Sequence, residues 1–424
     1  MVPSRMLTSL RYPAYRWLWF SNVAGSAGRW ALVLVLSAQL LEVTRSSFVV
    51  GLGLFLTQGP LILLAPYSGA LADRFDRRML NVVSAAVAAV VTSLLALLTW
   101  LGLMSTPLML VLTLLFGASF VFQLTLRSTL VPSVVPPERL LNAVSLFQVG
   151  TNVAQLLGPA MATPLLVWGG PALAWSLCAL LYATSALLSL FVGEVRAPRS
   201  PDHEGRQRLR HAFDYLRARP LVWTAILAVA LHCSLTMAYQ GMLPMFVSVD
   251  LHGDNSVYGL LLATIGLGAV TGSLVLAHFS DHRYLPLPFT FSLVGSGVCL
   301  AIMGAAPAIG VAIVSGLFVG ATQAIFMSMT LALIQGSVED SFRGRATSFY
   351  QLITLAPMAI FGWGMGGLAD VTEPRPVMVA SGILFLVITT AYAAWSPALR
   401  RLFKPSGWTR APFPVATATV RSVP

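Results

Sequence analysis

Long apolar stretches separated by short, arginine-bearing gaps run along almost the whole chain of 424 residues. Hydrophobic residues make up 57% of the sequence and charged residues only 10%, whereas a soluble domain carries about 25% charge. So few charges cannot cover a water-facing surface. The aspartates and glutamates all lie at or beyond the ends of the apolar stretches, so these stretches are suited to the interior of a membrane.

A bilayer-spanning helix needs roughly 20 mostly apolar residues. The stretches are continuous and do not alternate apolar with polar residues, which favours helices over the strands of a membrane barrel. We therefore expect an all-α membrane protein with 12 transmembrane helices. The expected spans are 17–41, 47–72, 79–102, 107–126, 142–167, 171–193, 221–247, 257–279, 286–305, 308–332, 346–369 and 377–395.

The basic residues divide the gaps into two classes. All but three of the 26 lysines and arginines lie in the two tails or in alternate gaps, and the exceptions are Arg29, Arg45 and Arg375. Because positive charge stays on the cytoplasmic side, we expect a multi-pass protein of the bacterial inner membrane with both termini in the cytoplasm. The net charge of +11 lies in short loops beside spans, so anionic lipid headgroups are better partners than nucleic acid.

The longest polar gap divides the spans into two sets of six. A shift of 203 residues aligns Gly69 with Gly272 and Gln148 with Gln351. This constant offset indicates two similar halves, a plan that places a transporter's binding site between them. We expect an N-terminal six-helix bundle at 1–193, a cytoplasmic linker at 194–219, a C-terminal six-helix bundle at 220–395 and a disordered cytoplasmic tail at 396–424.

The loop between the second and third spans reads Gly-Ala-Leu-Ala-Asp-Arg-Phe-Asp-Arg-Arg over residues 69–78. It resembles the loop signature of the major facilitator superfamily, with Asp76 in place of a glycine and Arg78 in place of a lysine. The segment 127–143 and the triplet 343–345 are similar to those of the bacterial enterobactin-exporter and macrolide-efflux-like group. The resemblance covers essentially the whole chain and implies two pseudo-symmetric six-helix bundles that rock about a central substrate site.

The loop signature also has a physical interpretation. Asp73 ends the second span, Arg127 ends the fourth, and Gly344 opens the eleventh, whose N-terminus carries partial positive charge. A carboxylate between an arginine and a helix N-terminus can form charge-assisted hydrogen bonds. We expect a conformational latch across the halves, closed when the cavity faces outward; alternatively, these charges only set orientation and solubility. The latch candidates are Gly69, Asp73, Arg74, Arg77, Arg78, Arg127 and Gly344.

Polar side chains inside spans are costly and usually face a bundle interior or a cavity. In the first span Asn22, Ser26 and Arg29 share one helical face, and in the seventh His232, Thr236 and Gln240 do the same. The resemblance implies a cavity lined by spans one, four, seven and ten, supported by five and eleven. The substrate-cavity candidates are Asn22, Ser26, Arg29, Gln123, Gln148, Asn152, Gln155, His232, Thr236, Gln240, Gln323 and Gln351.

Arg29 and His232 are separated by the same offset of 203 residues. We hypothesise that they form a pair of cationic groups that faces one cavity and suits an anionic or strongly polar substrate. His232 would then titrate near neutral pH and link transport to protons. The alternative is that Arg29 bonds to backbone carbonyls and His232 is a neutral packing group.

No enzyme signature is present in the sequence. The only lysine, Lys404, follows Phe403, so the chain has no Walker A loop, and we expect no cofactor, no metal and no catalytic residue. We expect a secondary active transporter, acting as a monomer, that exports a drug-like or siderophore-like amphipathic compound. The resemblance implies proton antiport, which makes protons, lipids and a small-molecule substrate the partners. The alternatives are uptake or exchange of an anionic metabolite, and a lipid flippase.

Overall fold

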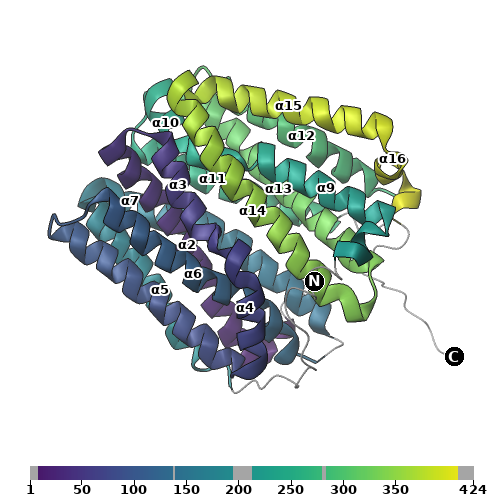
Figure 1. Ribbon diagram of the computed structural model, residues 1–424, viewed down its shortest axis with the longest axis horizontal. Helices are drawn as coiled ribbons and strands as arrows, with labels where there is room; N and C mark the ends of the chain where they lie inside the picture. The colour runs from purple at the N-terminus through teal and green to yellow at the C-terminus, as the bar shows by residue number, and fades with distance from the viewer. Residues whose placement is uncertain (1–7, 137–138, 194–212, 279–282, 409–424) are drawn as a thin grey trace.

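The computed structural model describes residues 8–136, 139–193, 213–278 and 283–408. Within these ranges every regular element is a helix, as expected. Figure 1 shows the helices gathered into two bundles, one purple to blue and the other teal to yellow. A few side chains inside these ranges are not described: those of residues 66, 69, 70, 72–74, 128, 141, 277, 278 and 340–345.

The first bundle holds the six expected N-terminal spans. The second span is divided into two helices at Gly59-Pro60, because proline has no N–H to continue the helical ladder. The fifth and sixth spans form one helical segment of 50 residues in which Gly170 has a φ of 74°. The elements are η1 (Thr8–Arg11), α2 (Pro13–Thr44), α3 (Ser47–Gln58), α4 (Pro60–Arg74), α5 (Arg77–Trp100), α6 (Thr106–Leu130), η2 (Val131–Ser133) and α7 (Leu140–Ser189).

The second bundle holds the other six spans. The seventh span is broken into four short pieces, and the remaining five are continuous helices. The elements are α9 (Pro220–Leu235), η4 (Ala238–Gly241), α10 (Leu243–Met245), η5 (Phe246–Asp250), α11 (Asn255–His278), α12 (Pro286–Gly304), α13 (Ile309–Ser337), α14 (Asp340–Thr372), α15 (Pro374–Trp395), α16 (Pro397–Leu402) and η6 (Pro405–Gly407).

Eleven helices among the described residues are long and apolar enough to cross a membrane. One of them is α7, which at 1.5 Å per residue would be about 75 Å long if straight. The hydrocarbon core is only about 30 Å thick. The break at Gly170 therefore separates two crossings, and the helical segments agree with the 12 expected spans.

The departure of the loop signature at Asp76 has a local explanation. Asp76 has an ordinary extended backbone, with φ −61°. Its side chain accepts a hydrogen bond of 2.9 Å from the backbone N–H of Arg78 and caps the start of α5. A glycine is not required at this turn, and aspartate is a preferred N-cap residue.

The expectation of a disordered tail over 396–424 is wrong for residues 397–408. These residues form α16 and η6, and Trp408 is fully buried. Its indole N–H donates to the carbonyl of Leu402 at 2.9 Å, and its ring lies 5.3 Å from that of Phe289. Burial of apolar side chains orders this segment against the second bundle. Residues 409–424 and 194–212 of the expected tail and linker lie outside the described residues.

Among the described side chains, the two bundles share an apolar core at one end of the molecule only. There, one cluster contains Leu40 and Val50 of the first bundle together with Tyr239, Phe246 and Leu261 of the second. At the end where α2 begins and α15 finishes, the clusters are separate. One contains residues of the first bundle only, and the other residues of the second bundle only. The halves are thus joined at the end away from the start of α2.

Candidate functional site

The two bundles meet along two helix pairs, α3 with α14 and α7 with α11, and Figure 1 shows α3 beside α14. Small residues allow the first contact: a Cβ placed on Gly51 would lie 2.9 Å from the carbonyl oxygen of Gly362. In the second pair, the amide of Asn152 donates to the hydroxyl of Ser273 at 2.8 Å. Asn152 was expected near the cavity, and it lies at this seam.

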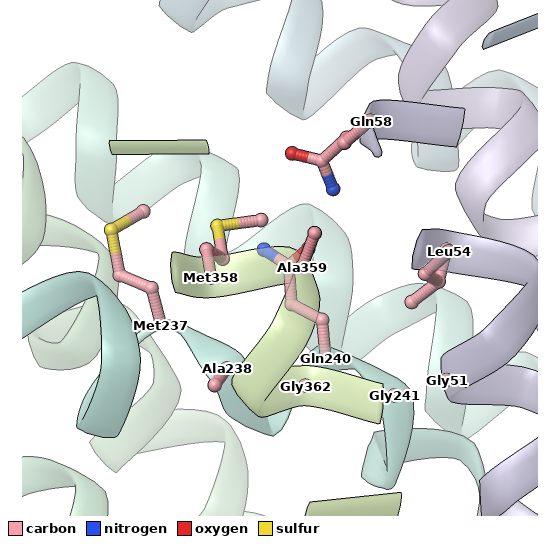
Figure 2. A pocket seen from close by; sticks show the side chains of 10 residues that line it. All are labelled: Gly51, Leu54, Gln58, Met237, Ala238, Gln240, Gly241, Met358, Ala359 and Gly362. Atoms are coloured by element: carbon pink, nitrogen blue, oxygen red, sulfur yellow. The ribbon is translucent and has the colours of Figure 1, made fainter. Parts of the chain in front are cut away.

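A pocket lies between the halves where α3, η4 and α14 converge (Figure 2). It contains about 230 Å³ of empty space, part of it open to solvent. The part of this space that a water-sized molecule can enter is only about 10 Å³, whereas ligand pockets commonly hold about 300–1,000 Å³, so the pocket does not admit a drug-sized molecule in this conformation. The lining residues are Gly51, Leu54, Gln58, Met237, Ala238, Gln240, Gly241, Met358, Ala359 and Gly362.

Two glutamines from opposite halves bring polar groups to this otherwise apolar pocket. Gln240 was expected in the cavity, whereas Gln58 was missed. Figure 2 shows both side chains reaching into the space between the helices. The carbonyl oxygen of the Gln58 side chain is buried without a hydrogen-bond partner. Gln58 is recognisable in the sequence as a polar residue in the middle of an apolar span, but it lies on the second span, which the resemblance does not place around the cavity.

A polar network fills the first bundle around Arg127. Its guanidinium donates to the side-chain oxygens of Asn22 at 3.3 Å, Gln123 at 3.1 Å and Ser185 at 3.3 Å. The hydroxyl of Ser26 donates to Asn22 at 3.3 Å. Three cavity candidates and one latch candidate thus meet inside one bundle. Ser185, from the end of α7, was not among the expected residues.

Arg29 and His232 have different surroundings in this conformation, and the hypothesis of a facing pair stays a prediction. The Arg29 guanidinium lies 4.5 Å from the ring centroid of Phe120, in the first bundle. The His232 ring is fully buried and lies 4.3 Å from Phe326 and 5.6 Å from Phe385, in the second. Each side chain contacts an aromatic ring of its own bundle, which an offset along the sequence does not reveal.

The remaining cavity candidates lie in several places. The hydroxyl of Thr236 lies 3.0 Å from Nδ1 of His232, and the carbonyl of Thr236 accepts a hydrogen bond of 2.8 Å from Gln323. On α7, Gln148 donates to Asn152 at 3.1 Å. Gln155 and Gln351 are both partly exposed. The candidates therefore lie in separate groups. Among these candidates, only Gln240 lines the pocket.

The latch is only partly visible. The side chains of Asp73 and Arg74 and the residues around Gly344 lie outside the described side chains, as does Gly69. Arg78 donates to the carbonyl of Leu190, and Arg77 is partly exposed. Arg127 points into the first bundle, as described above. The latch stays a prediction, and its place is the end where the two halves have separate cores.

A carboxylate connection between the halves is present at the opposite end. Asp370, near the end of α14, accepts hydrogen bonds from the backbone N–H of Ser47 and, at 3.1 Å, that of Phe48. It also accepts one from the hydroxyl of Ser46, which caps α3. A carboxylate at a helix N-terminus satisfies free N–H groups and the positive end of the helix dipole.

Comparison with known proteins identifies the family. The family described as transmembrane secretion effector matches residues 4–405. The chain belongs to this branch of the major facilitator superfamily. It is 24% identical over 399 residues to the enterobactin exporter EntS of Citrobacter koseri, covering 93% of this chain and 94% of that one. It is also 24% identical to EntS of Escherichia coli over 382 residues, with 89% and 90% covered.

This protein shares its fold with solved transporter structures. A POT family transporter has a TM-score of 0.70 at 14% identity, covering 91% of this chain and 96% of that one. A bacterial homologue of the human lysosomal transporter Spinster, in an inward-facing conformation, has a TM-score of 0.65 at 16% identity, with 95% and 98% covered. Family and relatives are transporters, so the chain is a multi-pass membrane protein of the transporter type.

Proposed function

We propose that this protein is a secondary active transporter that exports a small amphipathic molecule across the bacterial inner membrane by alternating access. The observation that carries the proposal is the one-ended closure of the molecule. The halves share an apolar core and the Asp370 connection at one end and have separate cores at the other. If the two bundles rock against each other, the closed end can open while the other end closes, and neither bundle has to unfold.

The arginine distribution sets the direction of this arrangement. The gaps rich in arginine lie at the end where α2 begins, and positive charge stays inside the cell. We therefore assign that end, with both termini, to the cytoplasm. In this orientation the core shared by the two bundles lies toward the outside, and the predicted latch lies at the cytoplasmic end, where the described cores are separate.

The proposed substrate class follows from the pocket and the relatives. The pocket joins methionine and aliphatic surface to the two amides of Gln58 and Gln240, and flexible methionine suits a binding surface for varied molecules. The relatives are named as enterobactin exporters, so a siderophore is the first compound to test. The chain lacks a Walker A loop, so an ion or substrate gradient supplies the energy, and we include proton antiport in the proposal.

Everted membrane vesicles from a host without other exporters test transport and its direction. We expect labelled enterobactin, or a labelled drug from a panel, to accumulate inside vesicles that contain the protein, and accumulation to fall when the proton gradient is collapsed. Net accumulation by intact cells instead would replace export with uptake. Movement of labelled phospholipid between leaflets, with no soluble compound moved, would favour the flippase alternative.

Variants of the pocket glutamines connect transport to the site. Gln58→Leu and Gln240→Leu should each raise KM several-fold while the thermal stability of the protein stays near that of the wild type. Gln335→Leu is the matched control, because Gln335 lies on α13 and bonds to Thr347 at 3.2 Å, outside the pocket. Equal KM values for all three variants would remove the pocket from the transport path.

A further inference from the structure

The Arg29 guanidinium lies near the middle of α2, with no anionic partner in the part of the chain that the structure describes. Its carbon Cζ is 4.5 Å from the ring centroid of Phe120 and 5.6 Å from that of Trp30. Its Nε is buried without a hydrogen-bond partner, and the described residues provide it with no ion pair. Cation–π contact offsets only about 0.5–2 kcal/mol, so the aromatic rings do not neutralise the charge.

A second buried guanidinium lies one helical turn away along α2. Arg127 passes so close to Gly25 that a Cβ there would collide with its terminal nitrogen, and Gly25 lies four residues before Arg29. The Arg127 side chain bonds to three neutral oxygens, those of the network described above, and its Nε is buried without a partner. Neutral dipoles orient and solvate a guanidinium, but they leave its positive charge in place.

Tyr182 connects the two arginines. A Cβ on Gly28 would lie 3.1 Å from the Tyr182 ring, which places the ring against α2 beside Arg29. The Tyr182 ring also lies 5.4 Å from that of Phe116, which is stacked 6.5 Å from Phe120, the ring beneath Arg29. The two arginines therefore form one positively charged region between α2, α6 and α7, and we name Arg29 and Arg127 the arginine pair.

No described carboxylate balances the arginine pair. In the first bundle the described carboxylate side chains are those of Glu42 and Asp76, and both lie at helix ends. An uncompensated charge away from water is unfavourable by several kcal/mol. Arg29 keeps part of its side chain exposed, so the region is accessible from its edge.

We propose that the arginine pair binds an oxyanion, the carboxylate or phosphate group of the transported molecule. The planar, rigid fork of a guanidinium matches both groups in geometry and charge. The inference rests on the proposed transport function and names its substrate class: amphipathic molecules with an acidic group. Phe120 and Trp30 beside Arg29 favour an aromatic ring next to that group.

Binding to the full-length protein in phosphatidylcholine nanodiscs tests the site without transport. Benzoate is the probe, and benzamide is its neutral counterpart of the same shape. We expect benzoate to raise Tm in a saturable manner and benzamide to leave it unchanged. Arg29→Gln should weaken benzoate binding at least tenfold, and Arg400→Gln, on the exposed face of α16, should leave it unchanged. Unaltered benzoate affinity in Arg29→Gln, or equal binding of benzamide, would overturn the proposal.

Arg127 requires a variant that protects folding. Arg127→Lys keeps the charge and loses the fork, so we expect a folded protein with weaker benzoate binding. Without any anion, Arg29→Gln should melt no lower than the wild type, because it removes an uncompensated charge. A lower Tm for Arg29→Gln both with and without benzoate, in the same proportion, would assign Arg29 a purely structural role and contradict the site.

Two further experiments identify the source of the oxyanion and test the proposed transport function separately. Nanodiscs containing phosphatidylglycerol that raise Tm and abolish the benzoate shift would support the site and assign it to lipid headgroups. Transport of an acidic compound in proteoliposomes should fall in Arg29→Gln. Unchanged transport in that variant overturns the substrate assignment alone, whereas benzoate binding without any transport by the wild type refutes the transport function alone.

Discussion

Asp370 of α14 caps the first turn of α3 by accepting a hydrogen bond from the backbone N–H of Ser47, 323 residues away in the sequence. The predicted latch would join the same two spans at their other ends, with the carboxylate on the second span instead of the eleventh. There, Asp73 at the end of the second span would face the N-terminus of the eleventh. Each of the two spans thus carries a carboxylate near its C-terminal end, and the observed one fixes the end at which the bundles share a core.

Asp370→Ala should weaken this closure. Loss of a helix cap lowers stability by about 1 kcal/mol, and here the cap joins two bundles. We expect Met237→Cys, which lies in the pocket, to react several-fold faster with a membrane-impermeant maleimide added on the Asp370 side. Glu42→Ala, an exposed carboxylate at the end of α2, is the control. Equal labelling rates in both backgrounds would contradict a gating role.

Gly51→Ala should separate α3 from α14. The added Cβ would meet the Gly362 carbonyl at 2.9 Å and the Trp363 Cα at 3.0 Å, and backbone atoms cannot move aside as a side chain can. We expect a loss of stability of about 1–3 kcal/mol, measured by thermal unfolding in detergent. Gly364→Ala is the matched control, since nothing lies within 4 Å of its Cβ; it should not destabilise the protein. A larger loss of stability in Gly364→Ala than in Gly51→Ala would mean that α3 and α14 are loosely packed against each other.

His232→Ala should reduce stability and leave the pH profile of transport unchanged. The ring is enclosed by Phe326 and Phe385, so its removal leaves a cavity, which costs about 3 kcal/mol for a large buried ring. Thermal unfolding and transport at several pH values provide the two measurements. A shift of the pH profile would restore the hypothesis that His232 carries protons.

Asp254 should make the start of α11 sensitive to acid. Hydrogen bonds from the Ser256 side chain and from the backbone N–H of Val257 hold the pKa of this carboxyl below its usual value. A lowered folded-state pKa gives stability that is present above the unfolded-state pKa and is lost as pH falls through the folded value. Asp254→Asn keeps a hydrogen-bond acceptor but cannot ionise. Below about pH 4 we therefore expect the Tm of this variant to fall less steeply than that of the wild type. An identical acid profile would exclude Asp254 as a contributor.

Cysteine labelling should place the two ends of the molecule on opposite sides of the membrane. Ser406→Cys, in η6, and Thr372→Cys, at the end of α14, are both exposed sites. In a background without the native cysteines, an impermeant maleimide should label Thr372→Cys in intact spheroplasts and Ser406→Cys only in everted vesicles. Labelling of both from one side would refute the 12-span topology.

The spans could be predicted because each membrane helix satisfies its own backbone hydrogen bonds, so local hydropathy is sufficient. The same reasoning missed Trp408, because its burial depends on the distant Phe289. It also missed Gln58, whose position in the pocket depends on how α3 lies against η4 and α14. The grouping of Asn22, Gln123 and Arg127 likewise requires three helices in their packed positions.

By itself, the sequence determined the number of spans and the family, since these depend on hydropathy and order along the chain. Only the tertiary structure decided at which end the described residues share a core and which aromatic rings Arg29 and His232 contact. The physical reason is that helix rotation and bundle tilt are set by contacts between residues far apart in sequence. Such contacts, like the one between Asp370 and Ser47, leave no local periodic signal.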